Sequence, residues 1–291
     1  DGSSGRIWMS RAVLVSIMPD GAVSGPYPGS AIAHVGTYRR VFPVTLERMY
    51  ENVLDWEHLP YVHASSFTSI RCLDYGAWGW RAEMTNPGGQ TLLIELRLDI
   101  ELRRWITRNL EGPARGAEIW THAFEIGPER VDINVDFFVP DVPAEARAKV
   151  GQAYARAYET LYDGDVPMMV QRARQLNRRI EPLRAGDIVI GRSDELRERL
   201  DRGEALIAQH SGREFRIARI DNGWVAFPAL CPHLLGPLDA APIENGKVHC
   251  PWHGYEFDLA SGECVSGSSC RFIRRPEVCE DGGELILHVP D

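Results

Sequence analysis

Two short cysteine–histidine loops near the C-terminal end of the chain constrain its fold more than any other feature. The first loop reads C-P-H from Cys231 to His233, and the second reads C-P-W-H from Cys250 to His253. Thiolate and imidazole donors in such pairs are the ligand set of a 2Fe–2S cluster in which two cysteines hold one iron and two histidines hold the other. We therefore predict that these four residues bind a 2Fe–2S cluster.

A zinc site is the main alternative for the same four residues. Structural zinc sites usually combine C-x2–4-C with H-x3–5-H spacing. The single residue between Cys231 and His233 does not suit that pattern. Four unrelated core residues are a further alternative, but the Gly/Pro-rich surroundings favour a ligand loop. The spacing therefore favours iron–sulfur over zinc.

The residues around the ligands, CPHLLGPL and CPWHGYEFD, resemble the Rieske domain of ferredoxins and ring-hydroxylating oxygenases. The resemblance covers residues 184–291. Gly236 and Trp252 stand where respiratory Rieske proteins carry a disulfide, and Tyr255 and Phe257 stand near positions where those proteins place Ser and Tyr hydroxyls. Hydrogen bonds to cluster sulfurs raise the reduction potential. The resemblance therefore implies a low-potential cluster that passes electrons onward.

The overall composition fits a globular protein with two domains. The chain has 291 residues, 44% hydrophobic and 25% charged, and a net charge of −9. This acidic balance argues against a basic nucleic-acid surface. No apolar run is long enough for a membrane span and no secretory signal is visible, so we expect a cytoplasmic protein. Four cysteines outside the loops are expected to be free thiols: Cys72, Cys264, Cys270 and Cys279.

Residues 44–59 carry apolar side chains at helical spacing, with Thr45 as a candidate N-cap. Pro60 cannot continue the hydrogen-bond ladder of a helix. We therefore predict that the helix kinks or ends there, which would swing His63 back toward His58.

This predicted helix carries a second cluster of ligand-type residues. Glu51, Asp55 and His58 share one helix face because they are spaced i,i+4 and i,i+3. Two imidazoles and a carboxylate with open positions form the facial triad of non-haem Fe(II) oxygenases. By itself, an Asp-x-x-His pair is more often ordinary polar structure. The Rieske motif in the same chain favours iron.

The stretch ENVLDWEHLPYVHASSF resembles the mononuclear-iron motif of Rieske non-haem iron oxygenases, acidic-x3-Asp-x2-His-x4-His. The resemblance implies that His58 and His63 bind Fe(II). It also implies that Asp55 links this iron to the cluster, with His253 as the exit from the cluster.

The resemblance further implies a distant carboxylate as the third iron ligand. The segment DGDVPMMVQ aligns best through Asp165, with Asp163 as the alternative. The segment departs from the family pattern because Gly164 precedes the aspartate. A helix cap ahead of Pro167 is the structural alternative for Asp165.

An alternating pattern between these two segments predicts an antiparallel meander. After it, a helix of about twenty residues begins near Asp141 with Pro143 at its first position, and the segment TLYDGDVPMMVQRARQLNRR closes the domain. Curved sheet plus long helix indicates an α+β, helix-grip, START-like domain. Trp120, His122 and Phe124 lie on one side of their strand, where they line a substrate cavity or belong to core and surface. The predicted strands are 6–18, 33–42, 78–85, 91–102, 117–126 and 131–139.

The predicted organisation is a START-like catalytic domain at 6–183 followed by an all-β Rieske domain at 184–291. This order is the reverse of that in the resembled oxygenases. In that family a homotrimer lets the cluster of one subunit serve the iron of its neighbour. The resemblance therefore implies a homo-oligomer, but the reversed order leaves open whether electrons pass within or between subunits.

We predict an oxygenase that uses O2 to hydroxylate or oxidatively demethylate an apolar small molecule. Electrons would come from a separate NAD(P)H-dependent reductase or a ferredoxin, because the chain has no G-x-G-x-x-G after a strand. The alternative is a START-like small-molecule or lipid-binding domain fused to a Rieske electron carrier without catalytic iron.

Overall fold

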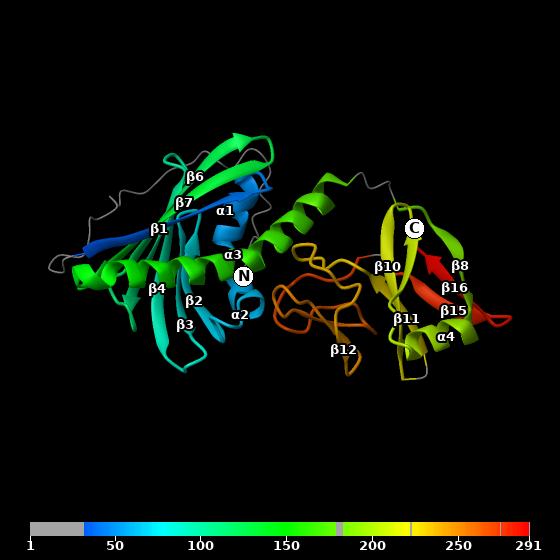
Figure 1. Ribbon diagram of the computed structural model, residues 1–291. Coiled ribbons are helices and arrows are strands. Elements are labelled where there is room, and N and C mark those ends of the chain that lie inside the picture. Colours follow the sequence, from blue (N-terminus) through cyan, green and yellow to red (C-terminus); the bar gives the residue numbers. More distant parts are fainter. Residues whose placement is uncertain (1–31, 179–182, 222, 274, 291) are drawn as a thin grey trace, which may run out of the picture.

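The computed structural model describes residues 32–178, 183–221, 223–273 and 275–290. Figure 1 shows a sheet crossed by one long helix in the N-terminal half and a smaller β domain in the C-terminal half. The expected strand at 6–18 lies outside the described residues. The predicted α+β class, an antiparallel sheet with a long helix followed by a smaller β domain, is confirmed.

The N-terminal domain is built on a seven-stranded antiparallel sheet with the order β1-β7-β6-β5-β4-β3-β2. Alternation explains its core: Val131, Ile133, Val135 and Phe137 are fully buried at every second position of one strand. The strands are β1 (Ile32–Phe42), β2 (Ser69–Gly76), β3 (Gly79–Thr85), β4 (Thr91–Asp99), β5 (Arg104–Glu111), β6 (Glu118–Gly127) and β7 (Arg130–Pro140).

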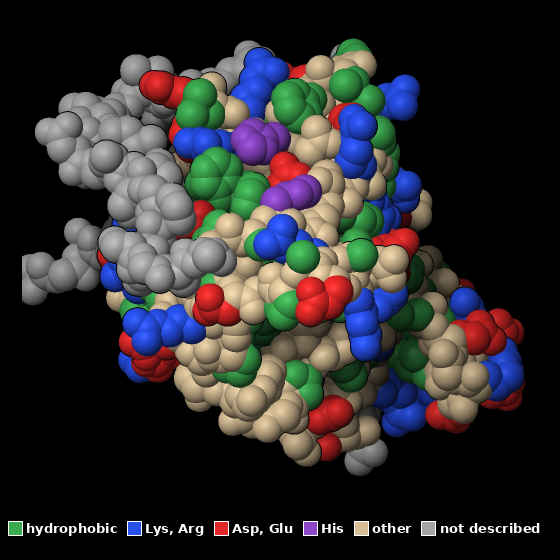
Figure 2. All heavy atoms as spheres, turned by 60° about the vertical axis from the view of Figure 1, so that its left-hand side comes forward, with side chains coloured by type: hydrophobic (Ala, Val, Ile, Leu, Met, Phe, Trp, Pro, Cys, Tyr) green, Lys and Arg blue, Asp and Glu red, His purple; other side chains and the backbone are tan. Residues whose placement is uncertain are grey.

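The sequence left open whether one side of β6 lines a substrate cavity or belongs to the core and surface. In the structure this side lies on the outer surface of the sheet. Phe124 is 47% exposed, and Trp120 and His122 are half-buried on the same side. The alternate residues Thr121 and Ala123 are 1% and 0% exposed and face the core. Figure 2, in which the N-terminal domain comes forward, shows hydrophobic, charged and histidine side chains intermixed on the surface.

The long helix α3 (Arg147–Asn177) follows a short turn, η2 (Ala144–Ala146), and has 31 residues instead of the predicted twenty or so. It runs through Pro167, whereas the alternative for Asp165 in the sequence was a helix cap just ahead of this proline. Met169 packs in the core of the N-terminal domain, and Met168 packs in a core of the C-terminal domain. Burial on both sides therefore outweighs the lost backbone hydrogen bond.

The ligand-bearing helix ends earlier than predicted. Helix α1 (Leu46–Leu54) begins at Thr45, whose hydroxyl accepts from the Arg48 amide at 3.3 Å, and Asp55 then leaves helical geometry with φ −86° and ψ 81°. A turn η1 (Trp56–His58) and a short helix α2 (Leu59–Val62) follow. Pro60 lies in the first turn of α2, where its missing N–H costs nothing. The break is therefore at Asp55 and not at Pro60.

The C-terminal domain contains three small antiparallel sheets. The first cysteine–histidine loop follows β11 and the second connects β13 to β14. Its elements are β8 (Gly186–Arg192), α4 (Ser193–Asp201), β9 (Leu206–His210), β10 (Arg213–Ile220), β11 (Gly223–Pro228), β12 (Ile243–Glu244), β13 (Lys247–His249), β14 (Glu256–Asp258), β15 (Glu277–Asp281) and β16 (Glu284–Val289).

Candidate metal centres

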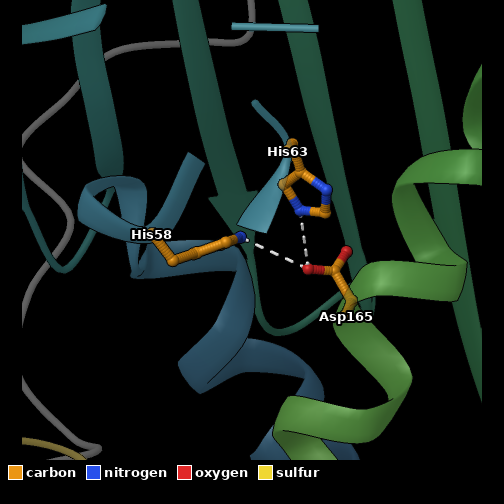
Figure 3. Close-up of side chains that lie close together, drawn as sticks. All are labelled: His58, His63 and Asp165. Atoms are coloured by element: carbon orange, nitrogen blue, oxygen red, sulfur yellow. Dashed lines mark hydrogen bonds and ion pairs between the residues drawn. The ribbon is translucent and has the colours of Figure 1, made fainter. Parts of the chain in front are cut away.

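Two histidines and one aspartate converge inside the N-terminal domain. His58 ends η1, His63 follows α2, and Asp165 lies in the middle of α3. Asp165 Oδ1 is 3.0 Å from His63 Nε2 and 3.3 Å from His58 Nε2. One ligand atom from each residue lies within 4.8 Å of the others, and all three side chains are buried (Figure 3).

The chemistry of this group fits a divalent metal. Burial alone would lower the pKa of His58, but hydrogen bonds to Asp165 and Asp55 raise it to about 10. Burial would raise the pKa of Asp165, yet His58 and His63 hold it well below its usual value. A metal that bound between these imidazole nitrogens and the carboxylate would have to displace the protons of the imidazoles. Two imidazoles and one carboxylate suit non-haem Fe(II).

The two candidate aspartates of α3 have different surroundings. Asp163 is 62% exposed at its side chain and pairs with Arg40 at 2.6 Å. Asp165 is buried, and the Asn52 amide also donates to its Oδ1 at 3.2 Å. The structure thus brings Asp165 to the histidines and leaves Asp163 outside. Since Asp165 lies far inside α3, it is not a helix cap.

The unexpected glycine before the aspartate has a steric explanation. A Cβ atom on Gly164 would lie 3.0 Å from Cε1 of the His63 ring. That is shorter than most Cβ contacts, so a larger residue here would press on the imidazole. Gly164 therefore allows α3 to approach His63 closely.

The four donors of the C-terminal loops also lie together. Cys231 and Cys250 are 0% and 1% exposed, and the ring centroids of His233 and His253 are 4.7 Å apart. The hydrogen bond between the two thiols lowers the pKa of Cys250 and raises that of Cys231. Nδ1 of His253 is buried without a hydrogen-bond partner. A buried nitrogen lone pair beside two buried thiols fits a 2Fe–2S cluster.

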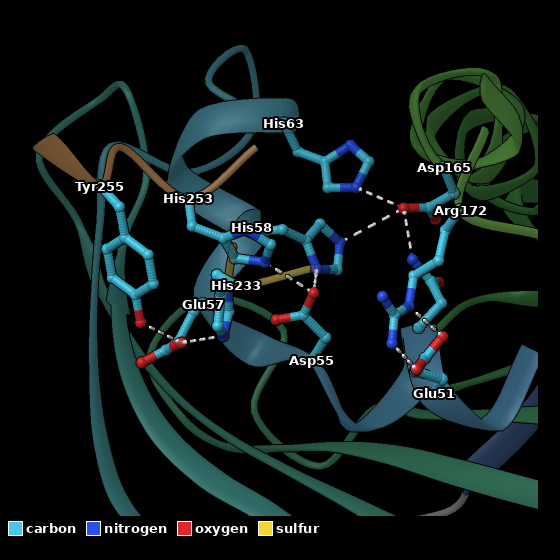
Figure 4. Close-up of polar contacts among 11 residues, drawn as sticks. Glu51, Asp55, Glu57, His58, His63, Asp165, Arg172, His233, His253 and Tyr255 are labelled. Carbon is cyan, nitrogen blue, oxygen red and sulfur yellow. Dashed lines mark hydrogen bonds and ion pairs between the residues drawn. The ribbon is translucent and has the colours of Figure 1, made fainter. Parts of the chain in front are cut away.

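Asp55 connects the two groups. Its Oδ2 accepts from His253 Nε2 at 2.8 Å and lies 3.6 Å from His58 Nδ1 (Figure 4). The Asp55 and His253 side chains are only 10% and 1% exposed. Burial would raise the pKa of Asp55, but the two histidines, His253 above all, lower it well below its usual value. The same contact raises the pKa of His253 to about 9, against the effect of burial.

A second carboxylate at this contact was missed in the sequence. Glu57 accepts from the Tyr255 hydroxyl at 2.8 Å and lies 4.0 Å from His233 Nε2. The only sequence signal for the role of Glu57 was its position two residues after Asp55. Asp55, Glu57, His233, His253 and Tyr255 are called the domain junction below.

Glu51, expected on the same face as the metal ligands, has another role. It forms a two-point ion pair with Arg172 of α3, with Nε and Nη2 at 2.7 and 2.6 Å, and also pairs with Arg48. Because α1 ends before Asp55, Glu51 does not share a face with His58. The ion pair joins α1 to α3, the helix that carries Asp165.

A family model described as the Rieske [2Fe-2S] domain matches residues 187–275. Pheophorbide a oxygenase of Arabidopsis thaliana is 38% identical over 69 residues, which are 21% of this chain and 13% of that protein. The oxygenase component of dicamba O-demethylase from Stenotrophomonas maltophilia is 47% identical over 36 residues, 12% of this chain and 10% of that protein. This chain therefore spans only a small part of the curated relatives it matches.

Among solved structures, the Zhui aromatase/cyclase from Streptomyces sp. R1128 is similar to half of the chain. The match has 16% identity and a TM-score of 0.43, and covers 50% of this chain and 99% of the other. Among the helices that the structure describes, none combines the length and apolar character needed to cross a membrane.

Proposed function

Because residues 187–275 form a Rieske [2Fe-2S] domain, we propose that this chain is the oxygenase component of a Rieske non-haem iron system. It would hydroxylate, or oxidatively demethylate, an apolar organic small molecule. Hydroxylation consumes one O2, two electrons and two protons, and yields the alcohol and water. The observation that carries the proposal is the contact series His253–Asp55–His58 between the two candidate metal centres.

In this proposal the four loop residues hold the cluster, and His58, His63 and Asp165 hold the mononuclear iron. With metals bound, the cluster supplies single electrons and the mononuclear iron supplies a binding place for dioxygen. Asp55 orients the ligands of both centres. By accepting at His253 Nε2 and lying beside His58 Nδ1, it leaves the opposite nitrogen of each ring to face its centre.

The burial of the connection supports electron transfer. His58, Asp55 and His253 are almost shielded from water, so the path between the centres is short and dry. Charges and dipoles in such a place are held in position and do not have to reorganise with solvent. Asp55 is therefore suited to couple the two centres while remaining a carboxylate.

The substrate is proposed to be apolar because apolar and aromatic side chains are packed next to Asp165 along α3. Tyr162 and Met169 flank Asp165 along α3 and belong to the core of the N-terminal domain. An apolar site with a few convergent polar groups is the usual form of a small-molecule site.

The electron donor is proposed to be a separate protein, a reductase or a ferredoxin. The dicamba O-demethylase relative is itself named as an oxygenase component. None of the six cysteines, all of which lie in the described part of the chain, forms a disulfide, which agrees with the reducing cytoplasm that we propose as its location.

Iron content and electron paramagnetic resonance test the proposed function. The purified protein should contain about three irons per chain and give a Rieske-type signal after reduction with dithionite. About two irons per chain, with no O2-dependent product, would favour a binding domain fused to an electron carrier. A colourless protein that contains zinc would contradict both functions.

A further inference from the structure

The contacts of the domain junction all lie within one copy of the chain. We propose that a single protomer is a complete electron-transfer unit, docked through two carboxylate–imidazole contacts, and that Glu57 positions the second histidine of the cluster loops. This inference rests on the proposed function. It replaces the trimer implied by the sequence resemblance with a path that needs no neighbouring subunit.

The first contact is the pair of Asp55 and His253, residues from different domains of the same chain. The 2.8 Å distance is that of a charge-assisted hydrogen bond. Since both side chains are shielded from solvent, the pair is complete as it stands. The place where a neighbouring subunit's histidine would have to dock against Asp55 is filled by His253 of this chain.

The second contact is made by Glu57. The Tyr255 hydroxyl holds the Glu57 carboxylate at 2.8 Å, and this carboxylate lies 4.0 Å from His233 Nε2. Figure 4 shows Glu57 and Asp55 directed toward the two histidine rings from the same short segment. His253 therefore faces the carboxylate of Asp55, and His233 faces the carboxylate of Glu57. Together the two contacts set the orientation of the cluster domain.

Close packing surrounds these polar contacts. Gly254, in the second cluster loop, has φ +63°, and a Cβ atom on it would lie 2.0 Å from the ring of Tyr61 in α2. The Tyr61 ring therefore fills the place that a side chain at position 254 would need. Val62 and Met168, both from the N-terminal domain, pack against a core cluster of the C-terminal domain. A second copy could reach the same surface only after these contacts separate.

The connection between the domains also favours the same chain. Helix α3, which carries Asp165 and Met168, ends at Asn177, and β8 begins at Gly186. A connection of this length keeps the cluster domain at a high effective concentration beside its own junction. Docking within one chain therefore competes strongly against docking between chains.

The electron count of the step is simple. The reduced cluster would give up one electron and so be oxidised by one unit. The mononuclear iron, held by His58, His63 and Asp165, would take up that electron and be reduced by one unit. No atom crosses the junction. The reductant is dithionite in the test and a one-electron carrier protein in the cell, and dioxygen is the terminal oxidant.

A mixing experiment tests whether the path lies within one protomer. Full-length protein lacking the cluster ligands (Cys231→Ser with Cys250→Ser) is co-expressed with full-length protein lacking an iron ligand (His63→Ala). The co-expressed pair, His63→Ala alone and the wild type are compared by stopped-flow reoxidation of the dithionite-reduced cluster in O2. Sedimentation velocity records the oligomeric state of each.

We expect fast reoxidation in the wild type at every protein dilution. The co-expressed pair should reoxidise only at the slow rate of His63→Ala alone. A pair that approaches the wild-type rate would show transfer between chains and overturn the inference. A wild type no faster than His63→Ala would instead overturn the proposed function, and the inference with it, so the two failures are distinguishable.

The role of Glu57 has its own readout, the reduction potential of the cluster. A carboxylate beside His233 disfavours the reduced cluster, which carries one more negative charge. Glu57→Gln should therefore raise the potential, and Glu57→Asp, which keeps the charge, should restore it toward the wild-type value. Glu256→Gln is the matched control, because Glu256 pairs with Lys247 at 3.0 Å instead. An unchanged potential in Glu57→Gln would refute the positioning role.

Discussion

The two candidate metal centres use related donors but are assembled in different ways. All four donors of the cluster loops come from one domain, from residues 231 to 253. The mononuclear site takes two histidines from one short segment and its carboxylate from a helix 102 positions further along the chain. The cluster loops therefore depend on local turns, whereas the mononuclear site depends on how α3 packs against α1 and α2. Changes in α3 beside Asp165, at positions such as Gly164 and Arg172, should therefore affect the mononuclear site and not the cluster loops.

The largest expected effect is the loss of a mononuclear iron ligand. His58→Ala removes one of three donors, so iron affinity should fall more than about 100-fold, the upper range for losing only an outer partner. Product formation should stop while the Rieske signal persists. Iron analysis and electron paramagnetic resonance measure both outcomes. His122→Ala, on the outer face of the sheet, is the control, and mononuclear iron retained in His58→Ala would contradict this assignment.

Asp55→Asn tests the link between the centres rather than either centre. Both metals should stay bound, but reoxidation of the reduced cluster should slow by about 10- to 100-fold, because the amide cannot orient both imidazoles. Stopped-flow absorbance follows the reaction. Unchanged reoxidation at full metal content would exclude Asp55 from the path.

Arg172→Met tests whether α3 positioning matters only to the mononuclear site. It leaves the half-buried Glu51 without its two-point partner, which should cost about 1–3 kcal/mol of unfolding free energy. Iron affinity should fall about 10-fold with the cluster unchanged. Thermal unfolding and iron titration check this, with Arg156→Met on the exposed side of α3 as the control. An equal loss of metal from the mononuclear site and from the cluster loops would contradict the view that the two centres are assembled independently.

Gly164→Ala should have the smallest effect on stability and the most selective effect on the site. Alanine favours helix by about 1 kcal/mol over glycine, which offsets part of the strain from the added methyl group. The methyl group presses on His63, so mononuclear iron should bind several-fold more weakly while unfolding changes little. Chemical denaturation and iron titration are the measurements. Wild-type iron affinity would show that His63 can move aside.

Short-range patterns predicted much of the fold. Alternation located β3, β4, β6 and β7, and Thr45 was identified as the N-cap of α1. The helix boundaries failed where contacts between domains compete with local preference. Asp55 leaves α1 to reach His253, and α3 passes through Pro167 because Met168 and Met169 are buried on either side.

The amino-acid sequence by itself determined which donors stand close together along the chain: the two cysteine–histidine loops and the pair of His58 and His63. Their spacings are short, so local turns suffice to bring them together. Only the tertiary structure decided between Asp163 and Asp165. Asp163 and Asp165 are two positions apart on a helix, so their side chains are separated by about 200° around its axis and just one of them can face the histidines.

The partner of each carboxylate at the domain junction was likewise visible only in the tertiary structure. Asp55 meets His253 and Glu57 meets Tyr255 across 198 positions of sequence, through the docking of two domains. Such contacts have no period or motif, because they depend on how two separately patterned surfaces fit together. That fit, and not the order of the domains along the chain, places both candidate metal centres on either side of one aspartate.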